Sequence, residues 1–337
     1  MIIDGAKAHD WCDIFRDKTV KLRVRKDDEE EESCSKSEEE ADSKHEVSRE
    51  DVEVKVVQSS WPYIRCTSYP TTRGTDLQVT CKTVHGNVVS FQPVLVLIRN
   101  EVRGVGRVND FRHVLQCFLH SGVCGVNSLE SLLMFMDRPT IHGQLTKLQR
   151  RVGMKSFPLL SQTCYASHHD MIIAPGFPMV AKVGFAHAGF GKMKLDSKEA
   201  FEDIRSVVAM ADTYCTAENF IDGAYDLRIQ KVGNHIRAFK RVSVSGNWKT
   251  NTGTSDVEEI EVTPQYRSWA QMASNAFPGG LDICTVDAIH CKKTGKEYIL
   301  EVNGTSSGLL PKYWEEDSRR IAEVALRKIE AEVPIWK

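Results

Sequence analysis

The chain has 337 residues, of which 41% are hydrophobic and 27% charged, and its formal net charge is −2. This composition is typical of a globular protein, and the length is sufficient for two domains with separate cores. No apolar stretch approaches the roughly 20 residues that a membrane-spanning helix needs, and the N-terminus lacks the basic segment and apolar core of a signal peptide. We therefore expect a cytoplasmic protein.

The ten cysteines show no Cys-x-x-Cys spacing. The closest pairs are Cys117 with Cys124 and Cys284 with Cys291. These spacings indicate neither a zinc site nor a disulfide framework. We expect reduced thiols, most of them in the core.

An acidic segment interrupts the first domain. Residues 27–53 contain 14 acidic and 3 basic side chains, a local charge of −11, so the rest of the chain carries about +9. The segment has hardly any apolar residue to bury, which predicts a disordered insert. It is compatible with a plain spacer, with a mask for the basic remainder, or with a phosphorylation target at Ser35, Ser37 or Ser43. The basic remainder favours anionic phosphates or an acidic membrane surface as partners.

The first domain has the pattern of a small α/β fold. Short strands are predicted at 54–57 and 77–81, and the apolar run 94–98 is typical of a strand buried in a parallel sheet. Apolar residues from Phe111 to Leu119 recur at helical spacing, and Gly122 follows them where a C-terminal cap belongs. We expect this domain to end near residue 125.

The region between that strand and helix does not predict a dinucleotide site. Gly104 and Gly106 are not followed by the third glycine of the dinucleotide-binding fingerprint. We therefore predict loop glycines here and no NAD.

The second domain begins with helical signals and continues into a glycine-rich hairpin. Pro139 opens a helix that should close around Gly153. The strands 179–183 and 193–195 flank a glycine-rich loop, and Asp196 is predicted to cap the helix that follows.

The glycine-rich loop is not a P-loop, because Ala186 and Met193 stand where that motif requires glycine and serine or threonine. Its glycines 184, 189 and 191 would still let backbone N–H groups approach phosphate oxygens, and Lys182 and Lys192 would supply positive charge. Glycine loops are common, so this loop by itself favours an ordinary turn, and its value as a phosphate-binding signal lies in the features that accompany it.

A second hairpin carries oxygen ligands. The strands 281–287 and 298–303 flank a turn centred on Thr294, which would set Asp287 opposite Glu301 with Asn303 on the same face. Carboxylate and amide oxygens so close together suit a hard divalent cation, and Mg²⁺ in proteins commonly binds carboxylates together with nucleotide phosphates. The alternative is that each acid is an ordinary solvated strand residue.

Polar and basic groups between the two hairpins complete a possible nucleotide site. Arg228 and Arg241 lie on consecutive strands around the hairpin signal Gly233-Asn234, and Asn251 follows; these groups could clamp a terminal phosphate. The candidate hinge for an adenine ring comprises Glu218, Asn219, Phe220 and Ile221, and an ordinary strand end is the alternative.

The order of these features resembles the ATP-grasp superfamily: lysine, glycine hairpin, hinge, arginine-bearing strands, then a hairpin with an acid and Glu-x-Asn. More narrowly, four segments are similar to signature segments of the synapsins. They are HAGFGK at 187–192, YDLRIQK at 225–231, SVSGNWKTNTG at 243–253 and GGLDIC at 279–284. The resemblance extends over most of residues 50–337.

The resemblance implies an α/β chain with a small parallel-sheet pre-ATP-grasp domain of synapsin N-terminal type at 1–125 and an ATP-grasp domain, α+β with antiparallel sheets, at 126–337. It implies ATP with Ca²⁺ or Mg²⁺ as ligands. The candidate metal ligands are Asp287, Glu301 and Asn303. The candidate ATP-binding residues are Arg138, Lys182, Gly184, Gly189, Gly191, Lys192, Glu218, Asn219, Phe220, Ile221, Arg228, Arg241 and Asn251.

The resemblance also implies a function. Synapsins are peripheral proteins of the cytoplasmic face of synaptic vesicles at presynaptic terminals, where they regulate neurotransmitter release by tethering vesicles to one another and to actin. The implied partners are an acidic phospholipid surface, actin and further copies of the chain, with no nucleic acid. No reaction is established for the family, so we expect an ATP-regulated scaffold in which the ligand shifts a population of conformations.

Two residues depart from the family, and the second of them keeps an alternative open. Arg138 replaces a lysine, and Asn303 replaces an apolar residue and restores the Glu-x-Asn pattern of catalytic ATP-grasp ligases. In a carboxylate-amine ligase, Lys182, Arg241 and bound metal would stabilise phosphoryl transfer. The sequence shows no second polar cluster that would indicate a pocket for a carboxylate substrate, and this favours the scaffold over the ligase. Because the resemblance corresponds to the central synapsin domain alone, we expect a fragment, a short isoform or a divergent gene product.

Overall fold

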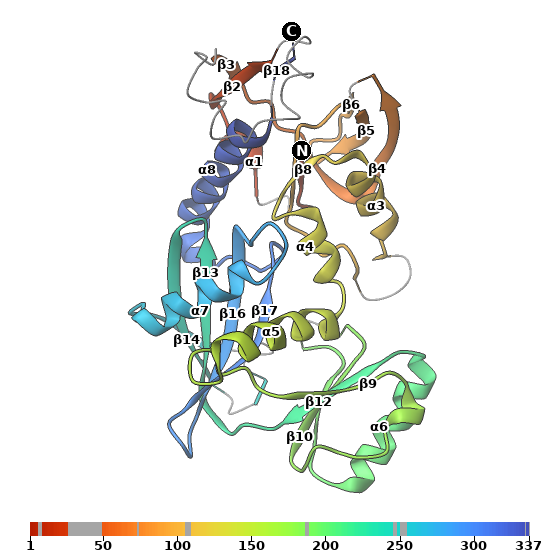
Figure 1. Cartoon of the computed structure of the whole chain (residues 1–337), viewed down its shortest axis with the longest axis vertical. Helices are drawn as coiled ribbons and strands as arrows, with labels where there is room; N and C mark the ends of the chain where they lie inside the picture. The colour runs from red at the N-terminus through yellow and green to blue at the C-terminus, as the bar shows by residue number, and fades with distance from the viewer. Residues whose placement is uncertain are drawn as a thin grey trace. The chain divides into compact units, whose positions relative to one another are not determined.

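The computed structural model divides into two compact units (Figure 1). The first unit comprises Met1–Leu129 with Gly308–Lys337, and the second comprises Glu130–Ser307. The structure describes residues 1–5, 9–25, 49–72, 74–104, 109–185, 189–244, 248–249, 255–333 and 335–336.

The first unit combines two sheets with helices. Its elements are β1 (Ile2–Ile3), α1 (Trp11–Ile14), β2 (Thr19–Arg25), β3 (Arg49–Glu53), β4 (Gln58–Thr71), β5 (Gly74–Thr83), β6 (Val88–Phe91), β7 (Leu95–Ile98), α3 (Arg112–Ser121), β8 (Cys124–Val126), the 3-10 turn η5 (Pro311–Tyr313), α8 (Trp314–Glu332) and β18 (Ile335–Trp336). The strand orders are β6-β5-β4-β1-β7-β8 and β18-β2-β3.

The larger sheet of the first unit is parallel in one half and antiparallel in the other. Strand β1 pairs in parallel with β4 and β7, and β7 pairs in parallel with β8. All four residues of β7 are buried, as expected for the apolar run that forms it. The expected parallel arrangement therefore holds for these strands, whereas β4, β5 and β6 form an antiparallel meander.

The predicted helix after β7 is confirmed as α3. Its residues Val114, Leu115 and Phe118 are buried, and its C-cap Gly122 adopts φ 68°, a left-handed conformation that glycine adopts without strain. The helix packs on β4 and β5.

Two segments differ from the sequence expectations. Residues 49–53, the end of the predicted acidic insert, form β3, in which Val52 pairs with Val20 of β2; the prediction of disorder was wrong there, since a partner strand was available. The rest of the insert, with Ser35, Ser37 and Ser43, lies outside the described residues. We had expected helix α8 in the second domain, but it belongs to the first unit. The reason is that it buries Ile321 and Ala325 and contacts β2, β7 and β8.

The second unit consists of two antiparallel sheets and the helices on them. Its elements are α4 (Leu129–Met134, whose first residue belongs to the first unit), α5 (Arg138–Val152), β9 (Gln162–Tyr165), the 3-10 turn η4 (His168–Asp170), β10 (Met179–Val183), β11 (Lys192–Leu195), α6 (Lys198–Ala211), β12 (Cys215–Asn219), β13 (Gly223–Val232), β14 (His235–Ser243), β15 (Ser255–Ile260), α7 (Pro264–Asn275), β16 (Ile283–Cys291) and β17 (Glu297–Asn303). The orders are β11-β10-β12-β9 and β15-β14-β13-β16-β17.

Each sheet of the second unit has its own core. Helices α5 and α7 bury residues such as Leu148 and Trp269 in a cluster with Ile229 and Val286 of the five-stranded sheet. Helix α6 buries Phe201 and other apolar residues against the four-stranded sheet. The opposite faces of these sheets are left to carry polar side chains.

Local signals in the second unit were mostly predicted correctly. Strands β13 and β14 form the hairpin around Gly233-Asn234, with Val232 paired to His235. The cap of α6 is a correction: Ser197, and not Asp196, accepts a hydrogen bond from the backbone N–H of Ala200. The carboxylate of Asp196 instead lies 3.0 Å from the Lys194 ammonium. Among the described helices, none is both long and apolar enough to cross a membrane.

Candidate nucleotide and metal site

The acidic hairpin has the predicted register. Asp287 of β16 pairs directly with Glu301 of β17, and an irregularity follows between Asp287 and Ala288. The side-chain amide of Asn303 donates a hydrogen bond of 2.7 Å to Oδ2 of Asp287. The two carboxylates and the amide therefore gather on one face of the sheet, as the turn position predicted.

Cations from other elements surround the acids. Arg138, at the start of α5, forms an ion pair with Glu301, whose other oxygen lies 3.6 Å from Nζ of Lys192. Arg228 of β13 has its Nη1 3.7 Å from Asp287, and its Nη2 donates to the Ser307 hydroxyl at 2.6 Å. The structure thus brings together the glycine hairpin, one arginine-bearing strand and the acidic hairpin.

The two acids respond in opposite ways to this environment. Burial raises the pKa of Asp287 to about 6, and the nearby Glu301 adds to this although Arg228 and Arg241 oppose it. Burial alone would also raise the pKa of Glu301, but Arg138, Lys192 and Lys182 outweigh it and hold that pKa well below its usual value. Asp287 is therefore the carboxylate that lacks sufficient positive charge.

A second ion pair lies in the four-stranded sheet. Nζ of Lys182 on β10 is 2.6 Å from Glu218 on β12, and their side chains are only 5% and 6% exposed. The amide of Gln162 on β9 donates to the other Glu218 oxygen at 3.1 Å. Three adjacent strands thus hold the buried Glu218 carboxylate, and it is the Lys182 ammonium that neutralises it.

The glycine loop is the tip of a hairpin, as predicted, because Lys182 pairs with Lys192 across β10 and β11. Gly184, Gly189 and Gly191 have φ values of 57°, 85° and 66°, which residues other than glycine rarely adopt. A Cβ on Gly184 would also lie 3.2 Å from the Thr213 hydroxyl oxygen. The described part of the loop therefore requires glycine for its conformation.

A cleft in the second unit contains most of the predicted site residues. Its empty volume is about 870 Å³, open solvent included. The predicted residues that line it are Lys182, Lys192, Glu218, Asn219, Phe220, Ile221, Arg228, Arg241, Asp287 and Glu301. Arg138 and Asn303 reach the site only through their contacts with the acids, the three loop glycines are not among the lining residues, and Asn251 lies outside the described residues.

Sequence reasoning did not single out the apolar walls of the cleft. They are formed by Leu160, Val180, Leu227, Ala288, Ile289 and Leu300, and Asp226, Trp248 and Lys249 also line the cleft. Phe220 meets Trp248 edge to face at 6.1 Å, and the ammonium of Lys194 lies 4.6 Å from the Phe220 ring. The aromatic and basic pair Trp248 and Lys249 was the one sequence signal that could have indicated further residues of the cleft. The apolar walls gave no signal, because apolar strand residues look alike whether they face a core or a cleft.

The fold is that of the ATP-grasp proteins. Similar solved structures include D-alanine–D-alanine ligase from Bacillus anthracis in complex with ATP, with TM-score 0.52 and 15% identity over 71% of this chain and 81% of that one. Another is a RiPP-associated ATP-grasp ligase from Chryseobacterium gregarium in complex with ADP and peptides, with TM-score 0.53 and 13% identity over 81% and 89%. At these identities the likeness shows the fold alone.

Sequence comparison gives the family. Residues 127–331 match the family model described as the synapsin ATP-binding domain. The chain is 37% identical to Synapsin of Drosophila melanogaster over 239 residues, which are 70% of this chain and 23% of that protein. The chain therefore belongs to the synapsin family and carries its ATP-binding domain, while spanning about a quarter of this relative's length.

Proposed function

We propose that the cleft of the second unit binds ATP together with a divalent cation and that the bound state regulates a vesicle-tethering scaffold. The observation that carries the proposal is the facing pair Asp287 and Glu301, with Asn303 beside it and lysines and arginines on the surrounding elements. Acids next to a cluster of cations provide for a metal and for the phosphates that accompany it.

The side chains fit a divalent cation. Asp287 has its pKa raised to about 6 by burial, so an added positive charge would stabilise its ionised form. Glu301 already interacts with Arg138 and Lys192. A metal ion would share Glu301 with these groups, and phosphate oxygens would in turn draw Lys192 and Arg138 toward the nucleotide. The same oxygens serve Ca²⁺ and Mg²⁺, whose selection rests on cavity size and rigidity.

The apolar part of the cleft suits an adenine ring. Phe220 and Ile221 provide ring and aliphatic surface at the end of β12. The backbone N–H of Phe220 already donates to Pro178 at 3.0 Å, so neighbouring backbone groups of the 218–221 segment would read the edge of the ring. Lys182 would turn from Glu218 to the phosphates when ATP binds.

The wider role rests on family membership. As a synapsin, the chain would act at presynaptic terminals as a peripheral protein of the cytoplasmic vesicle face, where it would bind acidic phospholipid, actin and further copies of itself and regulate neurotransmitter release. The first unit would serve as the pre-ATP-grasp domain and the second as the ATP-binding domain. ATP with metal would shift the population between two assembly states.

The test measures assembly. The mass of the chain in solution and its co-sedimentation with acidic phospholipid vesicles are followed with ATP and Mg²⁺, with ATP and Ca²⁺, and with ATP and chelator. We expect a metal-dependent change in wild type that is lost in Asp287→Asn/Glu301→Gln and retained in Glu202→Gln, which alters an exposed acid. Identical behaviour in all conditions would contradict the ATP-regulated scaffold.

A second candidate function is favoured by one observation, the contact of the Asn303 amide with Asp287. In a carboxylate-amine ligase these residues would hold metal while Lys182 and Arg241 stabilise the transferred phosphoryl group. ADP release that depends on an added carboxylate and amine, and that Asp287→Asn abolishes, would favour the ligase over the scaffold.

A further inference from the structure

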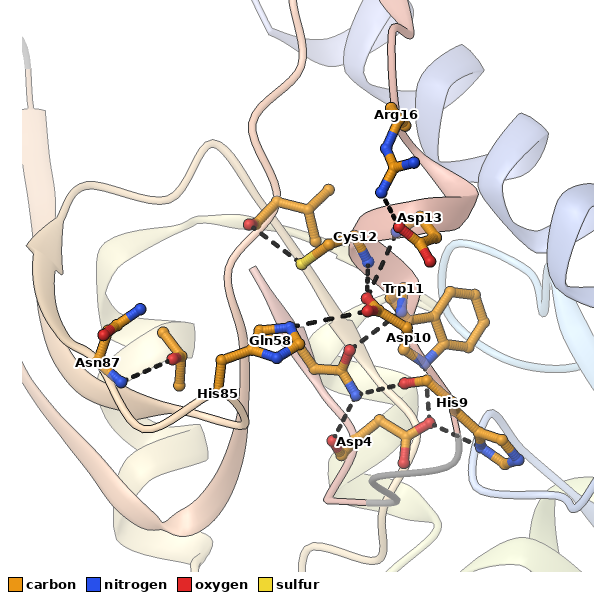
Figure 2. A network of polar contacts seen from close by, with 12 residues as sticks. Asp4, His9, Asp10, Trp11, Cys12, Asp13, Arg16, Gln58, His85 and Asn87 are labelled. Atoms are coloured by element: carbon orange, nitrogen blue, oxygen red, sulfur yellow. Dashed lines mark hydrogen bonds and ion pairs between the residues drawn. The ribbon is translucent and has the colours of Figure 1, made fainter.

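A cluster of three different metal-ligating side chains lies in the first unit. Two of them come from the start of α1 and the third from the turn between β5 and β6. One ligand atom each of Asp10, Cys12 and His85 lies within 4.8 Å of the other two (Figure 2). Nε2 of His85 is 3.8 Å from Oδ2 of Asp10. We propose that Asp10, Cys12 and His85 bind a Zn²⁺ ion.

The ligand set suits this ion. Thiolate, imidazole and carboxylate together are typical of Zn²⁺, whereas Mg²⁺ and Ca²⁺ prefer oxygen ligands alone. Zinc bonds of about 2.0–2.3 Å in a tetrahedral arrangement place the ligand atoms about 3.3–3.8 Å apart. Oxygen and nitrogen ligands lie about 3.3 Å apart in this geometry. The 3.8 Å between Asp10 and His85 must therefore shorten by about 0.5 Å, and a shift of about 1 Å would bring the Cys12 sulfur into range. Three protein ligands leave the fourth position to water or to a further ligand.

One buried residue anchors both segments that carry the ligands. Gln58 of β4 is 1% exposed, and its side-chain oxygen accepts the backbone N–H of Trp11 at 3.1 Å. Its side-chain amide donates to the His9 carbonyl at 2.8 Å. Its backbone carbonyl accepts the N–H of Val84, the residue before His85, at 3.1 Å. The backbone beside all three ligands is therefore held before any ion binds, which lowers the entropy lost on binding.

Hydrogen bonds orient the Asp10 carboxylate so that one of its oxygens faces His85. Its Oδ1 accepts the backbone N–H groups of Cys12 and Asp13 at 2.9 and 3.4 Å, as the N-cap of α1. Its Oδ2 is the oxygen that faces His85. The Cys12 thiol, on the same short helix, donates a weak hydrogen bond of 3.8 Å to the Val56 carbonyl.

The His85 turn is fixed yet accessible. The N–H of Thr83 donates to the Asn87 carbonyl at 2.8 Å, and the N–H of Asn87 donates to the Thr83 hydroxyl at 3.2 Å. The side chains of His85 and Asp10 are 56% and 38% exposed, so an ion can reach them from solvent. In Figure 2 the imidazole extends from this turn toward Asp10.

Binding requires no redox partner. The S–H bond of Cys12 breaks, its proton passes to solvent, and the thiolate donates an electron pair to the metal. Asp10 and His85 add one electron pair each. Cys12 and His85 lie far apart in the sequence, which is why cysteine spacing gave no sign of a zinc site.

The test uses Co²⁺ as a spectroscopic substitute for Zn²⁺, titrated into the full chain under reducing conditions with excess Mg²⁺ and no ATP. A sulfur-to-cobalt charge-transfer band reports a bound thiolate, which the oxygen ligands of the ATP cleft cannot produce. In wild type we expect one equivalent of Co²⁺ to give the band and stoichiometric Zn²⁺ to displace it. Cys12→Ala should lose the band.

Three variants separate ligation from folding, each with its circular dichroism spectrum compared with wild type. His85→Ala changes an exposed turn and should weaken Co²⁺ binding at least about tenfold. Asp10→Asn retains a residue that caps helices well and should also weaken it. Cys164→Ser removes an exposed thiol on β9 and should leave binding unchanged. Absence of the band in wild type, or its persistence in Cys12→Ala, would overturn the proposal.

Discussion

The two sheets of the second unit hold buried charge in different ways. In the four-stranded sheet, Glu218 forms an ion pair with Lys182 at 2.6 Å, and both side chains are almost fully buried. In the five-stranded sheet, Asp287 and Glu301 face each other, and the charged nitrogen in the ion pair of Asp287, Nη1 of Arg228, is 3.7 Å away. The first arrangement is balanced in the absence of a ligand. The second leaves Asp287 with a pKa raised to about 6 by burial, which is where an added cation would stabilise the protein.

The largest effect on stability is expected when the better-paired acid of the five-stranded sheet is neutralised. Glu301→Gln would leave Arg138 and Lys192 without their carboxylate, and we expect it to lower the free energy of unfolding by about 3–4 kcal/mol, measured by urea denaturation. The matched control is Glu202→Gln, whose partner Arg205 is exposed, with an effect below about 0.5 kcal/mol. Equal effects of the two variants would show that Glu301 is not held by these cations.

Breaking the pair of the four-stranded sheet tests the other side of the comparison. Lys182→Met would leave Glu218 buried without its cation, and we expect a loss of about 3 kcal/mol in the free energy of unfolding. Lys182→Met/Glu218→Gln removes both charges and should recover most of that loss, since a neutral pair has no buried charge to desolvate. A double variant that is as unstable as the single one would contradict a balanced one-to-one pair.

The pH dependence of stability distinguishes Asp287 from Glu301. The pKa of Asp287 is about 6 in the folded protein and 3.8 for a free aspartate, so Asp287 binds more protons in the folded state between these values and its contribution to stability falls as pH rises from about 4 to 6. The full shift corresponds to about 3 kcal/mol, and a side chain that is 25% exposed should give about 1–2 kcal/mol.

Asp287→Asn should therefore be more stable than wild type above pH 6 and similar to wild type near pH 4, in urea denaturation across this range. Asp196→Asn, at an exposed carboxylate, is the control and should change stability by less than about 0.5 kcal/mol at every pH. Parallel pH profiles of wild type and Asp287→Asn would show that Asp287 is adequately neutralised without a metal.

The smallest effect is expected at the aromatic edge of the cleft. Phe220→Ala removes a ring that we place against adenine and should weaken ATP binding about tenfold in calorimetry, while the requirement for metal stays unchanged. Tyr63→Ala, which removes an exposed ring in the first unit, is the control. Unchanged ATP affinity in Phe220→Ala would place the adenine elsewhere.

The strand pairing in the site could be predicted from the sequence because turn residues set it. The turn around Thr294 sets the pairing of Asp287 with Glu301, and the glycines between Lys182 and Lys192 set the pairing of these lysines, so both registers followed from short-range signals. The prediction that Asn303 lies on the same face as Glu301 followed from the alternation of side chains along a strand.

The remaining features depend on contacts between distant residues. The longest described strand, β4, was missed because Pro62 and Pro70 are poor strand residues, and pairing with β5 and β1 and contacts with α3 stabilise it. The contact of Arg138 with Glu301 joins a helix to a strand far along the chain. No periodicity or spacing reports such a contact, nor the uneven placement of cations that separates the pKa values of these two buried acids.

The most direct test of the account is the affinity of wild type and Asp287→Asn for ATP, measured by calorimetry with saturating Mg²⁺ and again with chelator at pH 7.5. We predict that Mg²⁺ strengthens ATP binding to wild type at least about tenfold and has little effect on Asp287→Asn, because the variant lacks the carboxylate that needs the cation. Equal dependence on Mg²⁺ in both proteins would contradict a metal site at the acidic hairpin.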